Sequence, residues 1–163
     1  MMMIHHISIP ANDPLHVAEV LAEVLNGKVG VFPPNLNSYM VVAGDEYGTL
    51  IEIYPANSEI VPGVGDRQAW FQQNNHPATY NAVHAAISIS TSLEQIERIA
   101  AREGWRVLLC NRDGLFDVVE FWVENQLMLE LLTPAIVHKY LNAMHPKNLE
   151  QLMLNMAQVE ARV

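Results

Sequence analysis

An internal repeat with a constant offset constrains the fold of this chain more than any other feature. Glu52 interrupts one apolar run that ends in a proline, and Glu130 interrupts a second such run at a residue number that is higher by 78. The same offset separates His6 from His84, each of which opens a stretch of alternating polar and apolar residues. A carboxylate inside an apolar strand is costly unless a partner compensates it. Two carboxylates at matching positions therefore indicate a duplicated unit in which both serve the same purpose.

The first copy of the repeat has the pattern strand, helix, three strands. Residues 4–10 alternate in polarity, which predicts a strand. Asp13 and Pro14 are typical of a helix start, and the apolar stripe that follows predicts a helix over 14–26 that ends at Gly27. Three β-rich runs predict further strands at 29–32, 38–43 and 49–54.

The second copy repeats this order. A strand is predicted from Val83, and Thr91 with Glu94 forms a candidate capping box for a helix that Gly104 closes. Strands are then predicted at 105–110, 117–123 and 127–132, with a turn at 111–114. The helix starts Asp13 and Thr91 keep the offset of the glutamates, and the glycines that end the helices depart from it by a single position. Duplication explains this agreement among unrelated landmarks.

These patterns predict an α+β fold with two tandem βαβββ modules in one domain over residues 1–134. The first module covers about 4–55 and the second about 83–134, and the Pro-, Gly-, Asn- and Gln-rich residues 56–82 between them are predicted to be a linker. Residues 135–163 are predicted to form a C-terminal helical extension, because apolar side chains from Leu149 to Met156 recur at helical spacing. Such a helix would cover an exposed sheet face or form a dimer seam.

Composition narrows the class of protein. The formal net charge of -9, with nine scattered Lys and Arg, argues against a nucleic-acid surface. No apolar run is long enough to span a membrane, and residues 1–10 do not have the pattern of a signal peptide. The single cysteine, Cys110, excludes an internal disulfide and favours a reducing compartment. We therefore expect a cytoplasmic protein that acts on a small molecule.

The histidines and glutamates of the repeat are candidate ligands of one metal ion. His6 shares its strand face with the small Ser8, and His84 shares its face with small residues too, so each imidazole faces space that its neighbours do not fill. Adjacent strands lie about 4.8 Å apart, so a His and a Glu on neighbouring strands can reach one ion at about 2.0 to 2.2 Å. We predict that His6, Glu52, His84 and Glu130 bind one divalent ion.

The donor set narrows the metal without identifying it. Two imidazoles and two carboxylates suit Zn, Ni, Co, Mn or Fe(II) better than Ca or Cu(I). Considered singly, each His is more typical of a hydrogen-bonded histidine at the end of a strand, and each Glu is more typical of a carboxylate at the edge of a sheet. The offset that the two pairs share favours the metal site instead. His5 competes with His6 as a ligand, but it shares a face with Ile7 and is expected on the packing side.

The two modules resemble the vicinal oxygen chelate superfamily, which includes glyoxalase I, methylmalonyl-CoA epimerase, extradiol dioxygenases, fosfomycin-resistance proteins and bleomycin-resistance proteins. His-Ile-Ser-Ile at His6 and Leu-Glu-Leu-Leu at Glu130 carry the resemblance, which covers residues 4–134. It implies glyoxalase-like modules whose curved sheets form a cup around one divalent metal ion. In the family the ligands meet within one chain or across a dimer; we expect a homodimer, and the resemblance leaves the arrangement open.

The resemblance also implies an activity. An octahedral ion with four protein ligands leaves two positions for a substrate with vicinal oxygens, and a glutamate that leaves the ion can act as a base. The expected function is a metal-dependent lyase or isomerase with Glu130 or Glu52 as the catalytic base. Glu52 favours this over dioxygenase or fosfomycin-resistance chemistry, since those branches use two His and one Glu. A metal-free binding protein and a regulatory subunit remain alternatives.

Overall fold

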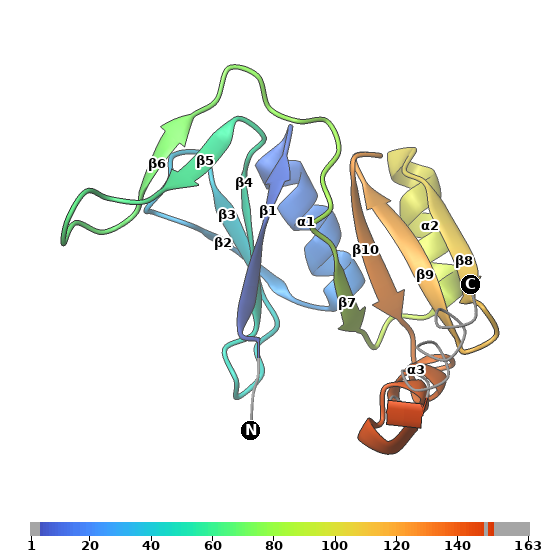
Figure 1. Cartoon of the computed structure of the whole chain (residues 1–163). Coiled ribbons are helices and arrows are strands. Elements are labelled where there is room, and N and C mark those ends of the chain that lie inside the picture. Colours follow the sequence, from blue (N-terminus) through green and yellow to red (C-terminus); the bar gives the residue numbers. More distant parts are fainter. Residues whose placement is uncertain (1–3, 149, 152–163) are drawn as a thin grey trace.

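The computed structural model of the chain describes residues 4–148, 150 and 151, and it contains the two predicted βαβββ modules (Figure 1). Module 1 consists of β1 (His6–Ala11), α1 (Pro14–Leu25), β2 (Lys28–Val31), β3 (Tyr39–Val42) and β4 (Leu50–Pro55). Module 2 consists of β7 (Ala85–Ser88), α2 (Leu93–Glu103), β8 (Val107–Arg112), β9 (Phe116–Val123) and β10 (Leu127–Leu132). The predicted α+β class is therefore confirmed.

Each module forms a separate mixed sheet, and the two sheets have matching strand orders. The orders are β1-β4-β3-β2 and β7-β10-β9-β8, with the first pair parallel and the others antiparallel. Ser8 pairs with Glu52 in module 1, and Ala86 pairs with Glu130 in module 2. Both members of the second pair follow their counterparts at the offset of the sequence repeat, so the strand register confirms the duplication.

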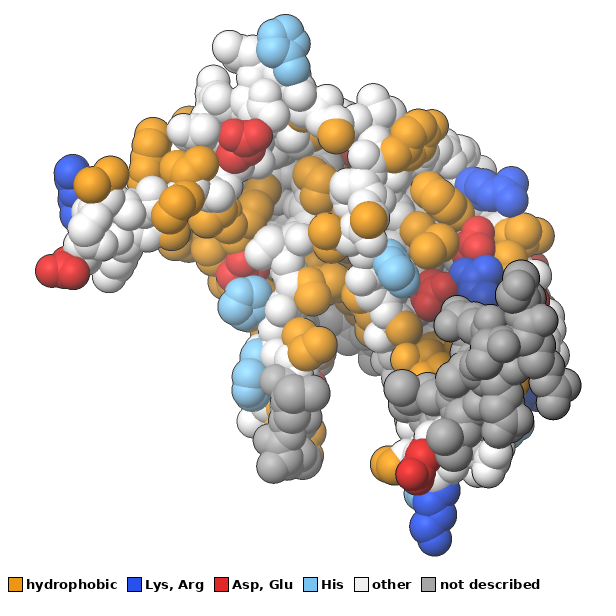
Figure 2. Space-filling view, in the orientation of Figure 1, with side chains coloured by type: hydrophobic (Ala, Val, Ile, Leu, Met, Phe, Trp, Pro, Cys, Tyr) orange, Lys and Arg blue, Asp and Glu red, His pale blue; other side chains and the backbone are white. Residues whose placement is uncertain are grey.

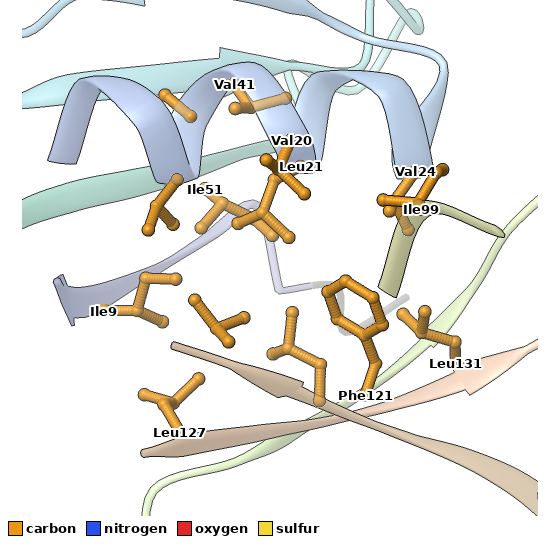
Figure 3. Close-up of a cluster of buried hydrophobic side chains, with 14 of the residues drawn as sticks. Ile9, Val20, Leu21, Val24, Val41, Ile51, Ile99, Phe121, Leu127 and Leu131 are labelled. Carbon is orange, nitrogen blue, oxygen red and sulfur yellow. The ribbon is translucent and has the colours of Figure 1, made fainter. Parts of the chain in front are cut away.

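The helices cover one face of each sheet, and both modules contribute to one apolar core. Figure 3 shows side chains from α1, such as Leu21, pointing toward Ile9 of β1 and toward Phe121 of β9. The Phe121 side chain is fully buried, and its ring meets that of Trp105 edge-on at 5.6 Å. Because side chains alternate along a strand, the polar residues of β1, β4, β7 and β10 lie on the other face of each sheet, away from this core.

The predicted caps Asp13 of α1 and Gly104 of α2 are confirmed, whereas the other two helix ends differ from the predicted positions by one residue. The capping box of α2 is formed by Ser92 and Gln95, whereas Thr91 is buried and donates a hydrogen bond to the carbonyl of Val24 in α1 at 2.6 Å. The C-cap of α1 is Asn26, which adopts the left-handed conformation with φ of 53°. Gly104 caps α2 in the same conformation. The caps Asn26 and Gly104 thus restore the constant offset that the glycines alone missed.

The segment predicted to be a linker contains a β-hairpin. β5 (Ser58–Val61) and β6 (Trp70–Gln73) pair antiparallel, and Phe71 packs edge-on against Tyr54 of module 1 at a ring distance of 5.2 Å. Strands of four residues with Glu and Gln among them are too short to show a clear alternation. The contact between Phe71 and Tyr54 packs the hairpin against module 1.

A short helix, α3 (Val137–Ala143), follows module 2. Lys139 pairs with Asp117 of β9 at 2.7 Å, and Tyr140 packs edge-on against Phe116 at a ring distance of 5.1 Å. Most of the helix predicted around residues 149–156 lies outside the described residues. Among the residues that the structure describes, no helix is long and apolar enough to cross a membrane.

Candidate metal and substrate site

Module 1 places four polar side chains together on its polar face. Glu52 of β4 is buried, and its Oε2 atom accepts hydrogen bonds from the Ser8 hydroxyl at 2.8 Å and from the Tyr54 hydroxyl. The Nε2 atom of His6 lies 3.9 Å from the same oxygen. The structure thus brings the predicted ligands His6 and Glu52 together, and we call these four residues the module 1 cluster.

Tyr54 acts as a fixed hydrogen-bond donor in this cluster. Burial raises the pKa of its hydroxyl to about 12, and the hydrogen bond to Glu52 acts in the same direction. The proton therefore stays on Tyr54 at neutral pH and points to the carboxylate. Sequence analysis did not assign Tyr54 to the site, although its position two residues after Glu52 places it on the same strand face.

Module 2 places an arginine between two carboxylates. The Nη2 atom of Arg112 lies 2.5 Å from Oε1 of Glu130 and 3.0 Å from Oε1 of Glu120. Glu120 pairs with Glu130 across β9 and β10, and its Oε2 atom also accepts a hydrogen bond from Trp122 Nε1 at 3.2 Å. One guanidinium thus pairs with two carboxylates, so Arg112, Glu120 and Glu130 together carry a net charge of one negative unit.

Within this group, the contacts between Arg112 and the two carboxylates favour the charged forms of Arg112 and Glu120. The hydrogen bond to Glu130, followed by that to Glu120, raises the pKa of Arg112, although burial opposes the shift. Burial acts to raise the pKa of Glu120, but hydrogen bonds from Trp122, Arg112 and Cys110 outweigh it and the pKa is lowered. Arg112 and Glu120 are therefore charged at neutral pH.

The sequence pattern does not indicate Arg112 or Glu120 as site residues. The predicted turn at 111–114 includes Arg112, but β8 extends to this residue, and the left-handed residues Asp113 and Gly114 form the turn. In a strand, Arg112 faces Glu130; in a turn it would not. Glu120 could have been found only from the pairing of β9 with β10, which requires the strand register.

His84 and His5 complete the account of the predicted residues. His84 lies two positions before Ala86, the residue paired with Glu130, as His6 lies two positions before Ser8, the residue paired with Glu52. Its ring is exposed, and Nδ1 lies 3.2 Å from the carbonyl oxygen of Ala82. His5, expected on the packing side, lines the same cavity as Ile7; it is exposed, and its Nδ1 lies 2.7 Å from the Tyr47 carbonyl oxygen.

The structure brings His6 and Glu52 together, whereas the ring of His84 contacts the Ala82 carbonyl and Glu130 is paired with Arg112. Within residues 4–148, 150 and 151, no three His, Cys, Asp or Glu side chains converge in a way that could hold a metal ion. His6 and His84 do line the same cavity of about 660 Å³, which lies between β1 and β7 and has apolar walls that include Ile51 and Ile87. A single chain in this conformation therefore does not fit a four-ligand metal ion.

Comparison with known proteins identifies the fold. No family model matches the chain, and no curated protein matches its sequence. Fosfomycin resistance protein FosX from Listeria monocytogenes, solved with Mn(II) and sulfate, is 14% identical with a TM-score of 0.55, over 89% of this chain and 99% of that one. FosX from Mesorhizobium loti is 14% identical with a TM-score of 0.51, over 80% and 90% of the two chains.

A third solved structure has a similar fold. The glyoxylase/bleomycin resistance protein/dioxygenase domain from Frankia sp. EAN1pec is 13% identical with a TM-score of 0.50, over 80% of this chain and 96% of that one. Identities this low show a shared fold and not a shared activity. The expected glyoxalase-like fold of paired βαβββ modules is thereby confirmed.

Proposed function

Starting from a chain with the vicinal oxygen chelate fold, we propose that this protein is a divalent-metal-dependent lyase or isomerase whose complete site forms across a homodimer. The observation that carries the proposal is the matching strand register of one His and one Glu in each module. In both modules the His precedes by two residues the partner of the Glu. Because no three candidate ligands converge among the described residues of one chain, a second surface would complete each site.

A second copy of the chain supplies that surface in this proposal. The core shared by the modules lies against the apolar faces of both sheets, so the polar faces are directed away from it. β1 and β7 are edge strands of their sheets, which leaves their outer backbone groups available for a partner. His6 and Glu52 of one copy would then hold the ion together with His84 and Glu130 of a second copy.

The chain's own residues would move the proton. When bound, the ion would polarise the vicinal oxygens of a small substrate. Glu52 would accept a proton from the carbon next to a carbonyl through its Oε1 atom, because Ser8 and Tyr54 hold Oε2. Glu130 is the weaker candidate for the base, since its Oε1 atom is paired with Arg112 at 2.5 Å.

Mixed dimers test both whether the protein binds a divalent ion and whether each binding site is shared between two copies of the chain. His6→Ala and His84→Ala chains carrying different affinity tags are co-expressed, and only dimers with both tags are kept and titrated with Mn(II) by calorimetry. If each site draws on two copies, the mixed dimer retains about half of the wild-type sites, because one of its two sites has both histidines. Each single variant should bind little Mn(II) on its own.

The matched control reverses the expected outcome. A wild-type chain paired with a chain that carries both His6→Ala and His84→Ala has no intact site in the shared arrangement, but one intact site if each chain builds its own. Binding in this control, with none in the first mixture, would show that the site lies within one chain. A wild-type protein that binds no Mn(II), Zn(II), Ni(II), Co(II) or Fe(II) would end the proposal of a metal enzyme.

A second candidate function is a metal-free protein that binds a small molecule. The pairing of Arg112 with Glu130 and Glu120 favours it, because these carboxylates are already partly neutralised without a metal. Under this alternative, Arg112→Met would weaken ligand binding whether or not a chelator is present. Dependence of activity on both a divalent ion and Glu52, tested with Glu52→Gln, would favour the lyase or isomerase instead.

A further inference from the structure

The β5–β6 hairpin and the segment after it enclose a cavity beside the module 1 cluster. This cavity, which we call the hairpin cavity, has a volume of about 430 Å³. Ser8 and Tyr54, the hydrogen-bond partners of Glu52, line it together with Glu59 of β5 and Asn74. Figure 2 shows apolar side chains gathered over the hairpin, which projects from module 1 in Figure 1.

The carboxylate of Glu59 is the strongest hydrogen-bond acceptor among the polar groups that line the hairpin cavity. Ser8 and Tyr54 donate to Glu52, and the Ser8 hydroxyl also lies 3.3 Å from the Tyr54 hydroxyl. The Nδ2 atom of Asn74 donates to Oε1 of Glu59 at 2.7 Å, and Gln72 Nε2 donates to Oε2 at 3.0 Å. Each carboxylate oxygen keeps a second lone pair. A ligand group that pairs with Glu59 must therefore donate hydrogen bonds.

The charge of the cavity has one sign. Glu59 is the one formally charged residue among the described residues that line it, and its two partners are neutral amides. A phosphate or carboxylate on a ligand would meet no cation among these lining residues. An ammonium group would form charge-assisted hydrogen bonds with Glu59, which are roughly twice as strong as neutral ones.

The remaining lining is apolar and contributed by Ile60, Pro77 and Val83 among others. We propose that the hairpin cavity binds the substrate through a protonated amino group that pairs with Glu59, while the apolar lining contacts the carbon chain of the substrate. This assignment rests on the proposed function, because Ser8 and Tyr54 link the cavity to Glu52. The substrate class is then a small amine with oxygen substituents, and anionic substrates are excluded.

Three matched probes test the charge preference. Phenethylamine, 2-phenylethanol and 3-phenylpropanoate share a carbon body and differ in the head group, and each is titrated into metal-free, full-length protein by ligand-observed NMR. Phenethylamine should bind about tenfold more tightly than 3-phenylpropanoate, the difference expected for one charge-assisted contact. Glu59→Gln should remove most of this preference and change binding of the alcohol much less than binding of the amine.

Two further variants make the result decisive. Glu59→Lys should reverse the ranking of the amine and the carboxylate, whereas Glu94→Gln, which changes an exposed acid on α2 with a side chain 81% accessible, should leave it unchanged. Equal or tighter binding of 3-phenylpropanoate, or an amine affinity that Glu59→Gln does not alter, would overturn the assignment. Since the probes are measured without metal, a failure here and a failure to bind Mn(II) are separate results.

Discussion

Glu124 is the residue through which module 2 contacts the start of α1. Its carboxylate accepts hydrogen bonds from the backbone N–H groups of Asn12 at 2.6 Å and Asp13 at 2.9 Å. Asp13 is the N-cap of α1, so the negative charge lies at the positive end of the helix dipole. This contact should hold the two modules in their relative orientation, and Glu124→Gln removes the charge while keeping the side chain's size.

The expected loss follows from the exposure of the contact. Hydrogen bonds to charged groups contribute about 1.5 to 3 kcal/mol when they are shielded from water, but an exposed charge at a helix N-terminus contributes about 0.3 to 1 kcal/mol. Because both bonds to Glu124 are exposed, we expect the free energy of unfolding to fall by about 1 kcal/mol. For a chain of this length, that lowers Tm by roughly 2 to 4 °C. Glu124 is left-handed with φ of 49°, and Gln at this position should experience the same backbone strain as Glu.

Urea unfolding followed by tryptophan fluorescence measures this loss. The midpoint should fall while the slope of free energy against urea stays constant, because the surface exposed on unfolding does not change. Glu94→Gln, which removes an exposed acid that pairs with Arg98 within α2, should shift the midpoint by much less. Equal midpoints for wild type and Glu124→Gln would refute the view that this carboxylate holds the modules together.

Three other changes probe the site and the core. The pKa of Tyr54 is raised from about 10 to about 12 on folding, so the stability that this shift contributes is fully present below pH 10 and is lost as the pH rises through about 12. In wild type the urea midpoint should therefore fall over that pH range, and Tyr54→Phe should make the fall smaller. Phe121→Ala should cost about 3 to 5 kcal/mol and lower both modules' stability in one transition, seen as a single urea curve. Arg112→Met leaves Glu130 and Glu120 facing each other, so Tm should fall by a few degrees in chelator and recover with millimolar Mn(II); no recovery would argue against a cation site there.

Much of the fold could be predicted because it depends on local patterns. Alternation along β1 and β4 places His6, Ser8 and Glu52 on one face, and the capping residue Asp13 marks the start of α1. The constant offset between the two repeats predicts that module 2 has the same strand register, which the pairing of Ala86 with Glu130 confirms. Such features need only neighbouring residues and a regular strand or helix geometry.

The features of the fold and of the candidate site that could not be predicted depend on contacts between segments that are distant in the sequence. The role of Arg112 follows from how far β8 extends, and that of Glu120 from its pairing with β10. The β5–β6 hairpin depends on Phe71 packing against Tyr54. No local pattern encodes these partners, since very short strands and a single charged side chain are compatible with several structures.

The sequence by itself determined the duplication and the order of elements in each module, because periodicity and capping act within a few residues. Only the tertiary structure decided where His6, Glu52, His84 and Glu130 lie relative to one another. Burial of Ile9, Leu21 and Phe121 in one core sets the orientation of the modules, and that orientation directs the polar faces of both sheets away from the core. The free energy of this packing comes from many apolar contacts between residues that are distant in the sequence. The orientation of the modules therefore could not be predicted from either repeat alone.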